Sequence, residues 1–146
     1  MNSFKRTLKE NSTSFVSIII ISRINAALNG IRDTDIKAVM LIGSSSIGKS
    51  HAVNEWLASN PNTTFKLISG YISPARLYSL IYENKDKTII FRDVNIFNKE
   101  NLGILKAMME TPFEVARELQ RTKDNLPPSF VFLGNIIIEC NALPKN

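Results

Sequence analysis

The chain has 146 residues, a length that predicts a single domain. Hydrophobic residues make up 44% of it and charged residues 21%, so disordered, collagen-like and low-complexity classes are excluded. Its apolar stretch at residues 15–21 contains a serine and falls far short of the roughly 20 residues that a membrane-spanning helix needs. No secretory cleavage site follows that stretch, and the one cysteine, Cys140, cannot form an internal disulfide. We therefore expect a cytoplasmic protein (in the host cytoplasm if viral) without a membrane anchor.

Positive charge is in modest excess, with 18 lysines and arginines against 13 acidic residues and a formal net charge of +5. Such a balance permits a polyanionic partner without requiring one. The charges form no dense block and are spread over residues 5–9, 85–87 and 117–123. Two interpretations stay open: a nucleic-acid contact at the loop that holds Arg117 and Arg121, and an ordinary solvated surface.

Helix and strand patterns alternate along the chain. In chain order they predict a helix over residues 14–28, a strand over 38–42, a helix over 51–57, a strand over 64–69, a helix from 73, a strand over 88–91, a helix over 98–110 and a strand over 136–140. Four strands separated by helices are typical of a parallel α/β sheet. We expect residues 1–33 to form a helical lead and residues 34–146 the α/β core.

Local signals sharpen these elements. Asn29-Gly30 is expected to end the first helix, and Ser73-Pro74 is a strong helix start, with serine as the cap and proline in the first turn. The unbroken apolar run 38–42 predicts a strand buried on both faces. Residues 111–132 break the alternation and predict an inserted, hairpin-like excursion.

Residues 43–50 read G-S-S-S-I-G-K-S and satisfy the phosphate-binding P-loop pattern G-x-x-x-x-G-K-[ST]. A predicted strand precedes this segment and a predicted helix follows it, so backbone N–H groups and the helix N-terminus can surround phosphate. Lys49 is expected to meet the β- and γ-phosphates, and the Ser50 hydroxyl to bind Mg²⁺. His51 is expected on the helix face beside the phosphates. The predicted nucleotide-binding residues are Gly43, Ser44, Ser45, Ser46, Ile47, Gly48, Lys49, Ser50 and His51.

Two further polar residues follow predicted strands. Asp93 comes just after the strand at 88–91, where an acidic Mg²⁺ partner is expected, although Arg92 stands directly before it. The alternative is a surface aspartate paired with Arg92. Asn141 ends the last strand, at the edge where α/β sheets bind ligands. Its amide is expected either to hold a water against the terminal phosphate or to form an Asx turn.

Three segments together resemble the nucleotide-binding core of AAA+ ATPases, above all small AAA-type ATPases of phage, plasmid and archaeal mobile elements. They are G-K-S-H at residues 48–51, I-S-G-Y-I-S-P at 68–74 and F-L-G-N-I-I-I-E-C-N at 132–141. The resemblance covers roughly residues 36–141. It implies a three-layer P-loop NTPase fold with a mostly parallel sheet, ATP and Mg²⁺ at a subunit boundary, assembly into a homo-oligomeric ring, and ATP hydrolysis that moves protein or nucleic acid.

By this resemblance, Lys49 and Ser50 take phosphate and Mg²⁺, and Asn141 is the first sensor. Asp93 falls in the family's acidic pair, which makes it the expected catalytic acid and a metal contact. The chain departs from the family in two ways. Arg92 stands at the position of the metal-binding acid, and the sequence stops just after Asn141, before a fifth strand, an arginine finger and a helical lid. We expect either a fragment of a longer protein or a shortened one.

Three functional hypotheses follow. The first is a Mg²⁺-dependent ATPase that remodels protein or nucleic acid. The second is a nucleotide-binding scaffold that no longer hydrolyses ATP, because the Arg92 cation competes with Mg²⁺. The third is a small nucleotide kinase, for which only Arg117 and Arg121 could serve as lid arginines.

Overall fold

The computed structural model describes residues 13–43, 48–92, 98–117 and 125–141, with only the backbone considered for residues 13–22. Its elements, in chain order, are α2 (Thr13–Asp33), β1 (Ala38–Ile42), α3 (Lys49–Ser59), β2 (Phe65–Ser69), α4 (Pro74–Glu83), β3 (Thr88–Arg92), α5 (Lys99–Met109), β4 (Glu114–Ala116), β5 (Ser129–Val131) and β6 (Asn135–Cys140). Among the described residues, no helix combines the length and apolar character needed to cross a membrane.

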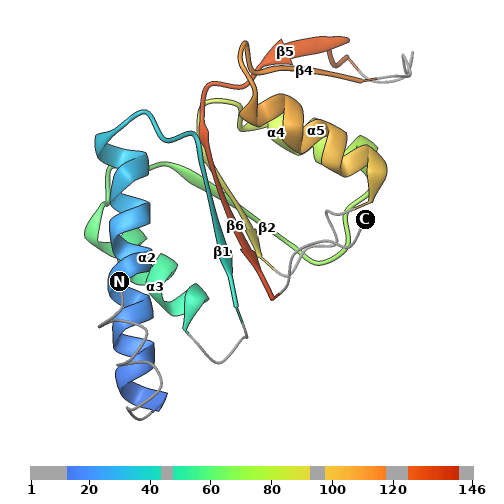
Figure 1. Cartoon of the computed structure of the whole chain (residues 1–146). Helices are drawn as coiled ribbons and strands as arrows, with labels where there is room; N and C mark the ends of the chain where they lie inside the picture. Colours follow the sequence, from blue (N-terminus) through green and yellow to red (C-terminus); the bar gives the residue numbers. More distant parts are fainter. Residues whose placement is uncertain (1–12, 44–47, 93–97, 118–124, 142–146) are drawn as a thin grey trace.

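Four strands form a parallel sheet in the order β1-β6-β3-β2. Helices α2 and α3 cover one face and α4 and α5 the other, so the chain is a three-layer α/β structure (Figure 1). The predicted parallel α/β sheet is therefore confirmed. Because all four strands run the same way, their carboxyl ends share one edge of the sheet, and this edge receives the loop from β1 to α3.

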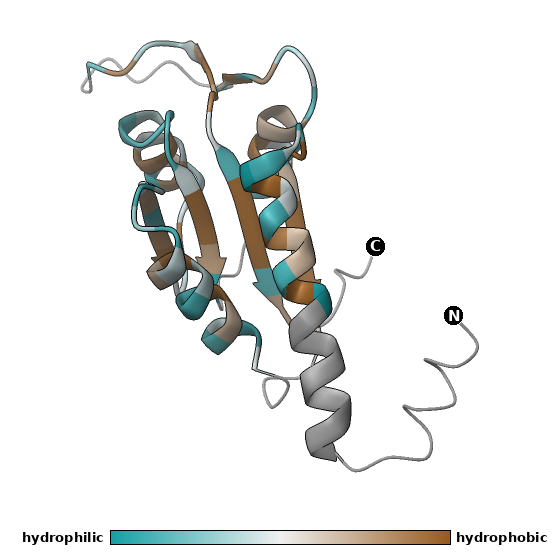
Figure 2. Cartoon of the chain, turned by 90° about the vertical axis from the view of Figure 1, so that its left-hand side faces the viewer, coloured by the Kyte–Doolittle hydropathy of each residue, from teal (hydrophilic) through white to brown (hydrophobic). Residues whose placement is uncertain are grey.

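The two central strands carry the core. On β3, Ile89 and Phe91 pack with α4 and α5, whereas Ile90 packs with α2 and α3. These side chains are at most 1% exposed, and full burial of such a side chain stabilises the fold by roughly 1.5–3 kcal/mol. Figure 2 shows the resulting apolar strands behind the two helices of one face. A strand buried on both faces has no polar alternation, which is why the sequence run 88–91 is continuously apolar.

Two predicted details are wrong. The strand β1 is not buried on both faces, because it lies at the sheet edge: Leu41 is buried, but Met40 is 39% and Ile42 45% exposed. Helix α2 does not end at Asn29-Gly30 but continues to Asp33. The additional turn buries Ile31 in the same apolar cluster as Trp56, and this packing outweighs the weak helix propensity of glycine.

The predicted starts of the helices at residues 73 and 98 are confirmed, whereas α3 begins at Lys49, two residues before the predicted start. The Ser73 side chain caps α4 by accepting a hydrogen bond from the Arg76 amide, and the Asn98 side chain caps α5 by accepting from the Asn101 amide at 2.8 Å. Each cap satisfies one N–H group that the helix itself cannot pair.

The excursion predicted at residues 111–132 is a separate two-stranded antiparallel sheet of β4 and β5. It lies beyond the amino ends of the large sheet's strands, at the end opposite the β1–α3 loop (Figure 1). Phe130 of β5 packs edge-on against Tyr78 and Tyr82 of α4, with ring centroids 5.2 and 5.4 Å apart. The excursion is thus anchored by aromatic packing and leaves the carboxyl edge of the sheet clear.

Candidate functional site at the carboxyl edge of the sheet

The turn into α3 depends on Gly48. This residue is the N-cap of α3 and has φ 82° and ψ 25°, a left-handed conformation that glycine adopts without steric cost. Glycine has no side chain that could accept a hydrogen bond from the first turn of α3, and that turn contains no acidic residue. The N–H groups and the positive end of the helix dipole are therefore not neutralised by a cap side chain or an acid of the first turn, which favours an anion at this position.

Lys49 follows at the first turn of α3 and is only 5% exposed. Its amino group donates hydrogen bonds to the Gly43 carbonyl and to the Asn141 side-chain oxygen, the latter at 3.2 Å. Gly43 is itself tied to β6, because its amide donates to the Cys140 carbonyl at 3.1 Å. A buried lysine is thereby held between the ends of β1 and β6.

Ser50 and Glu139 meet at the same edge. The Ser50 hydroxyl donates to Oε1 of Glu139 at 2.5 Å, and the Glu139 side chain is 3% exposed. Glu139 lies on β6 opposite Leu41 of β1 and Arg92 of β3 in the strand register. The sheet therefore carries a buried carboxylate next to the serine of the loop motif.

Arg92 balances that carboxylate. Its Nε and one terminal nitrogen both approach Oε2 of Glu139, at 3.0 and 2.8 Å, and the terminal nitrogen also donates to the Asn54 side chain at 3.1 Å. Burying an unpaired carboxylate is strongly unfavourable, and this ion pair offsets the cost. The alternative that Arg92 pairs with Asp93 involves a residue outside the described part of the chain. Among the described residues, Arg92 forms an ion pair with Glu139.

The structure brings most of the describable predicted residues together. Lys49, Ser50 and Asn141 lie at one edge with Arg92, which the sequence placed near the metal site, and with the unpredicted Glu139, and we call these five residues the carboxyl-edge cluster. Asp93 and residues Ser44, Ser45, Ser46 and Ile47 lie outside the described residues. His51 is well exposed on α3, with its Nε2 3.0 Å from Oε1 of Glu55, so the structure gives it a contact within its own helix.

Glu139 is the residue that the sequence interpretation missed. One signal could have identified it, because an acidic residue directly follows the three isoleucines of β6, in a strand that reads as buried. Charged side chains are almost never fully buried unless they are paired, so a glutamate in that position predicts a partner. Its neighbours were not predictable, since they depend on β1 and β3 flanking β6.

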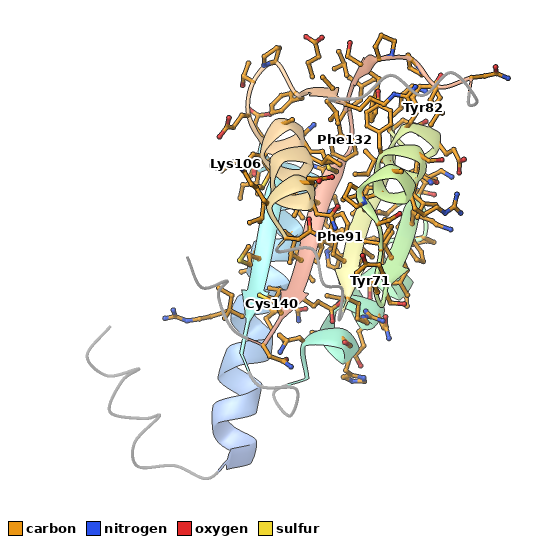
Figure 3. The ribbon with its side chains drawn as sticks, turned by 90° about the vertical axis from the view of Figure 1, so that its right-hand side faces the viewer. Tyr71, Tyr82, Phe91, Lys106, Phe132 and Cys140 are labelled. Atoms are coloured by element: carbon orange, nitrogen blue, oxygen red, sulfur yellow. The ribbon has the colours of Figure 1, made fainter. Side chains whose placement is uncertain are left out.

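Two features border the cluster. Cys140 stands between Glu139 and Asn141, near the end of the sheet opposite Phe132 (Figure 3). Burial raises the pKa of its thiol, while the charge of Lys49 lowers it by less. On the other side, between α2 and β1, lies an open, mostly apolar pocket lined by Ile24, Ala27, Met40 and Ile42, with Lys49 at its wall.

The cluster fits a phosphate-bound Mg²⁺ ion. Mg²⁺ is usually held by one or two protein oxygens together with phosphates and waters. A serine hydroxyl has one proton and two lone pairs, so Ser50 can donate to Glu139 and still present a lone pair to a metal. A hydroxyl and a carboxylate thus stand together beside a lysine at the N-terminus of α3.

Comparison with known proteins gives a distant relative. The chain is 28% identical over 89 residues to a protein of Enterobacteria phage T4 described as "Uncharacterized 36.7 kDa protein in nrdC-mobD intergenic region". The match covers 57% of this chain and 27% of the phage protein, so the chain corresponds to about a quarter of that protein's length. No protein-family model matches the chain, and no solved structure matches it significantly.

Proposed function

We propose that the chain binds ATP together with Mg²⁺ at the carboxyl edge of the sheet, as a P-loop NTPase. The observation that carries the proposal is Lys49, a buried lysine at the N-terminus of α3 whose amino group is held by the Gly43 carbonyl and Asn141. In the motif G-S-S-S-I-G-K-S this lysine is the residue that reaches the β- and γ-phosphates. Both of these described partners are uncharged oxygen acceptors, which a phosphate oxygen could replace.

The rest of the edge supports the same ligand. The uncapped first turn of α3 favours the triphosphate, and the apolar pocket beside Lys49 offers a surface for the base. Ser50 and an acidic residue would hold Mg²⁺, which supplies charge stabilisation to the phosphate oxygens. ATP is the expected nucleotide through the resemblance to AAA+ ATPases.

We further propose that the bound ATP is hydrolysed to ADP and phosphate, with Asp93 as the acid that activates water and Asn141 as a residue that orients it. The energy would drive remodelling of protein or nucleic acid in a ring of identical subunits. The similarity to a phage protein agrees with the mobile-element setting that the resemblance implies. A nucleic-acid contact through Arg121 belongs to the same proposal.

A second candidate is a nucleotide-binding scaffold without hydrolysis, and Arg92 is the observation that favours it. The guanidinium lies within 3 Å of Glu139 at the end of β3, next to the expected Mg²⁺ position. No comparable observation among the described residues favours the nucleotide-kinase alternative. Arg117 directly follows β4, donates to the Leu126 carbonyl and lies over the Tyr78 ring. The strand β4 lies at the end of the sheet opposite the β1–α3 connection (Figure 1).

The test is to measure ATP affinity by calorimetry and ATP turnover with Mg²⁺ for the unmodified chain, Lys49→Ala and Lys106→Ala. Lys106 is an exposed lysine of α5 on the far side of the sheet, so its removal takes away the same charge without touching the cluster. We expect Lys49→Ala to abolish both binding and turnover and Lys106→Ala to change neither. Binding without turnover would favour the scaffold. Equal ATP binding by Lys49→Ala and the unmodified chain would refute the P-loop proposal.

A further inference from the structure

We infer that Glu139, on β6, is the carboxylate that positions Ser50 as a ligand of the Mg²⁺ ion of the bound nucleotide, and that Arg92, on β3, is the charge partner of Glu139. This inference rests on the proposed function. It assigns to β6 the acid that the resemblance to AAA+ ATPases places at the end of β3, where this chain has Arg92. The observation behind it is the juxtaposition of Ser50, Glu139 and Arg92 at one edge.

Glu139 is a buried charged residue in an apolar strand. The Glu139 side chain is 3% exposed, in a strand whose neighbours Ile137 and Ile138 are apolar and buried. Replacing a buried ion pair by apolar residues often costs nothing or stabilises a fold, so the pair itself is poor evidence for a purely stabilising role. An acid and a base kept at adjacent strand ends, beside a phosphate-binding motif, indicate a use at the site.

The two carboxylate oxygens of Glu139 have different partners. Both Arg92 nitrogens approach Oε2 of Glu139, which leaves Oε1 to the Ser50 hydroxyl. The serine proton is thus directed toward the carboxylate, and the serine lone pairs are directed elsewhere. A ligating hydroxyl whose proton is held by a carboxylate is oriented and made more basic, as outer partners of metal ligands generally are.

Arg92 is fixed between β6 and α3. Its guanidinium is held from two sides, by Glu139 and by the Asn54 side chain of α3 at 3.1 Å. An arginine fixed in this way cannot turn toward the serine while it keeps both partners. The cation therefore balances the charge of Glu139, and the inference predicts that it keeps this role while Mg²⁺ is bound.

The experiment measures ATP affinity in EDTA and in Mg²⁺, and Mn²⁺ binding by electron paramagnetic resonance with ATP present. It compares the unmodified chain with Glu139→Gln and with the control Glu114→Gln, an exposed glutamate of β4. We expect Mg²⁺ to strengthen ATP binding by the unmodified chain. Glu139→Gln should weaken Mn²⁺ binding by about 10–100-fold, as loss of such a partner does, while ATP binding in EDTA remains measurable. Glu114→Gln should behave like the unmodified chain.

A second variant tests whether any loss of Mn²⁺ binding results from misfolding of Glu139→Gln. Glu139→Gln leaves the Arg92 cation without its partner, so the double variant Arg92→Gln/Glu139→Gln, which cancels both charges, is measured alongside and should show the same loss of Mn²⁺ binding. Unchanged Mn²⁺ binding in the folded Glu139 variants would overturn the inference while the proposed function stands. ATP binding that Mg²⁺ does not strengthen in the unmodified chain would overturn it as well. No ATP binding in either buffer would instead refute the proposed function.

Discussion

Two lysines stand at the two ends of β1, and their surroundings differ. Lys37 directly precedes the strand and lies over two aromatic rings, with its amino nitrogen 4.2 Å from the Phe113 centroid and 4.8 Å from that of Phe132. It also donates to the Phe132 carbonyl at 3.0 Å. Burial lowers the pKa of this lysine. We call Lys37, Phe113 and Phe132 the amino-end cluster.

Lys49, by contrast, faces the Gly43 carbonyl and the Asn141 amide oxygen, and it begins a helix whose cap supplies no side-chain acceptor. Lys49 is buried and Lys37 is partly buried, and both donate to a backbone carbonyl. The two lysines differ in that Lys37 lies over aromatic rings, whereas Lys49 stands at the N-terminus of a helix. The comparison teaches that burial and a carbonyl partner alone do not identify a phosphate-binding lysine, whereas a place at a helix N-terminus favours that role.

The largest effect on stability is expected at the amino-end cluster. Phe132 is fully buried, and its replacement by alanine leaves a cavity beside Lys37, so Phe132→Ala should lower the free energy of unfolding by about 3–5 kcal/mol. Urea unfolding measures the loss. Because the cavity lies at the far end of the sheet, ATP affinity of the folded fraction should stay unchanged. If folded Phe132→Ala lost ATP affinity, the amino end of the sheet would also contribute to ATP binding, and the contrast between the two ends would be wrong.

A smaller effect is expected at the carboxyl-edge cluster. Glu139→Leu leaves the Arg92 guanidinium without its buried partner and should lower the free energy of unfolding by about 3 kcal/mol. The double variant Arg92→Leu/Glu139→Leu removes both charges and should recover most of that loss in the same unfolding measurement. The single variant Arg92→Leu completes the comparison. If the loss in the double variant equals the sum of the losses in Arg92→Leu and Glu139→Leu, then Arg92 and Glu139 do not act as a pair.

The smallest effect is expected from Lys37→Met, which keeps an apolar stem and removes the charge. Loss of the ring contacts and one hydrogen bond should cost about 1 kcal/mol near neutral pH. The folded-state pKa of Lys37 lies below its unfolded value, so the unfolded chain binds more protons between the two values and stability rises there with pH. Unfolding curves should show that the free energy of unfolding of the unmodified chain, relative to that of Lys37→Met, increases as the pH approaches the ordinary lysine pKa of about 10.4. A falling difference would mean that burial does not disfavour the charged amine.

Sequence patterns predicted much of this structure. The apolar run of β3 and the caps at Ser73 and Asn98 depend on neighbouring residues, and the structure confirms them. The prediction for β1 failed, because an apolar run does not reveal whether a strand is central or at an edge. The helix end at Gly30 failed because distant packing of Ile31 decides it.

The candidate site divides in the same way. The motif at residues 43–50 is contiguous, so the lysine and serine could be named from the sequence alone. Glu139 and Arg92 are 47 positions apart and meet only because β3 and β6 are neighbours in register. Strand order is set by the whole fold, so it cannot be predicted from the spacing of residues along a short stretch of sequence.

The central claim is that ATP binds at the carboxyl end of β1 and not at its amino end. The most direct test is to add ATP with Mg²⁺ to the ¹⁵N-labelled chain and follow the backbone amide signals by nuclear magnetic resonance. The account predicts the largest shifts at Gly48, Lys49, Ser50 and Asn141, and little change at Phe113 and Phe132. Shifts centred on the amino-end cluster, or none at a saturating ATP concentration, would contradict it.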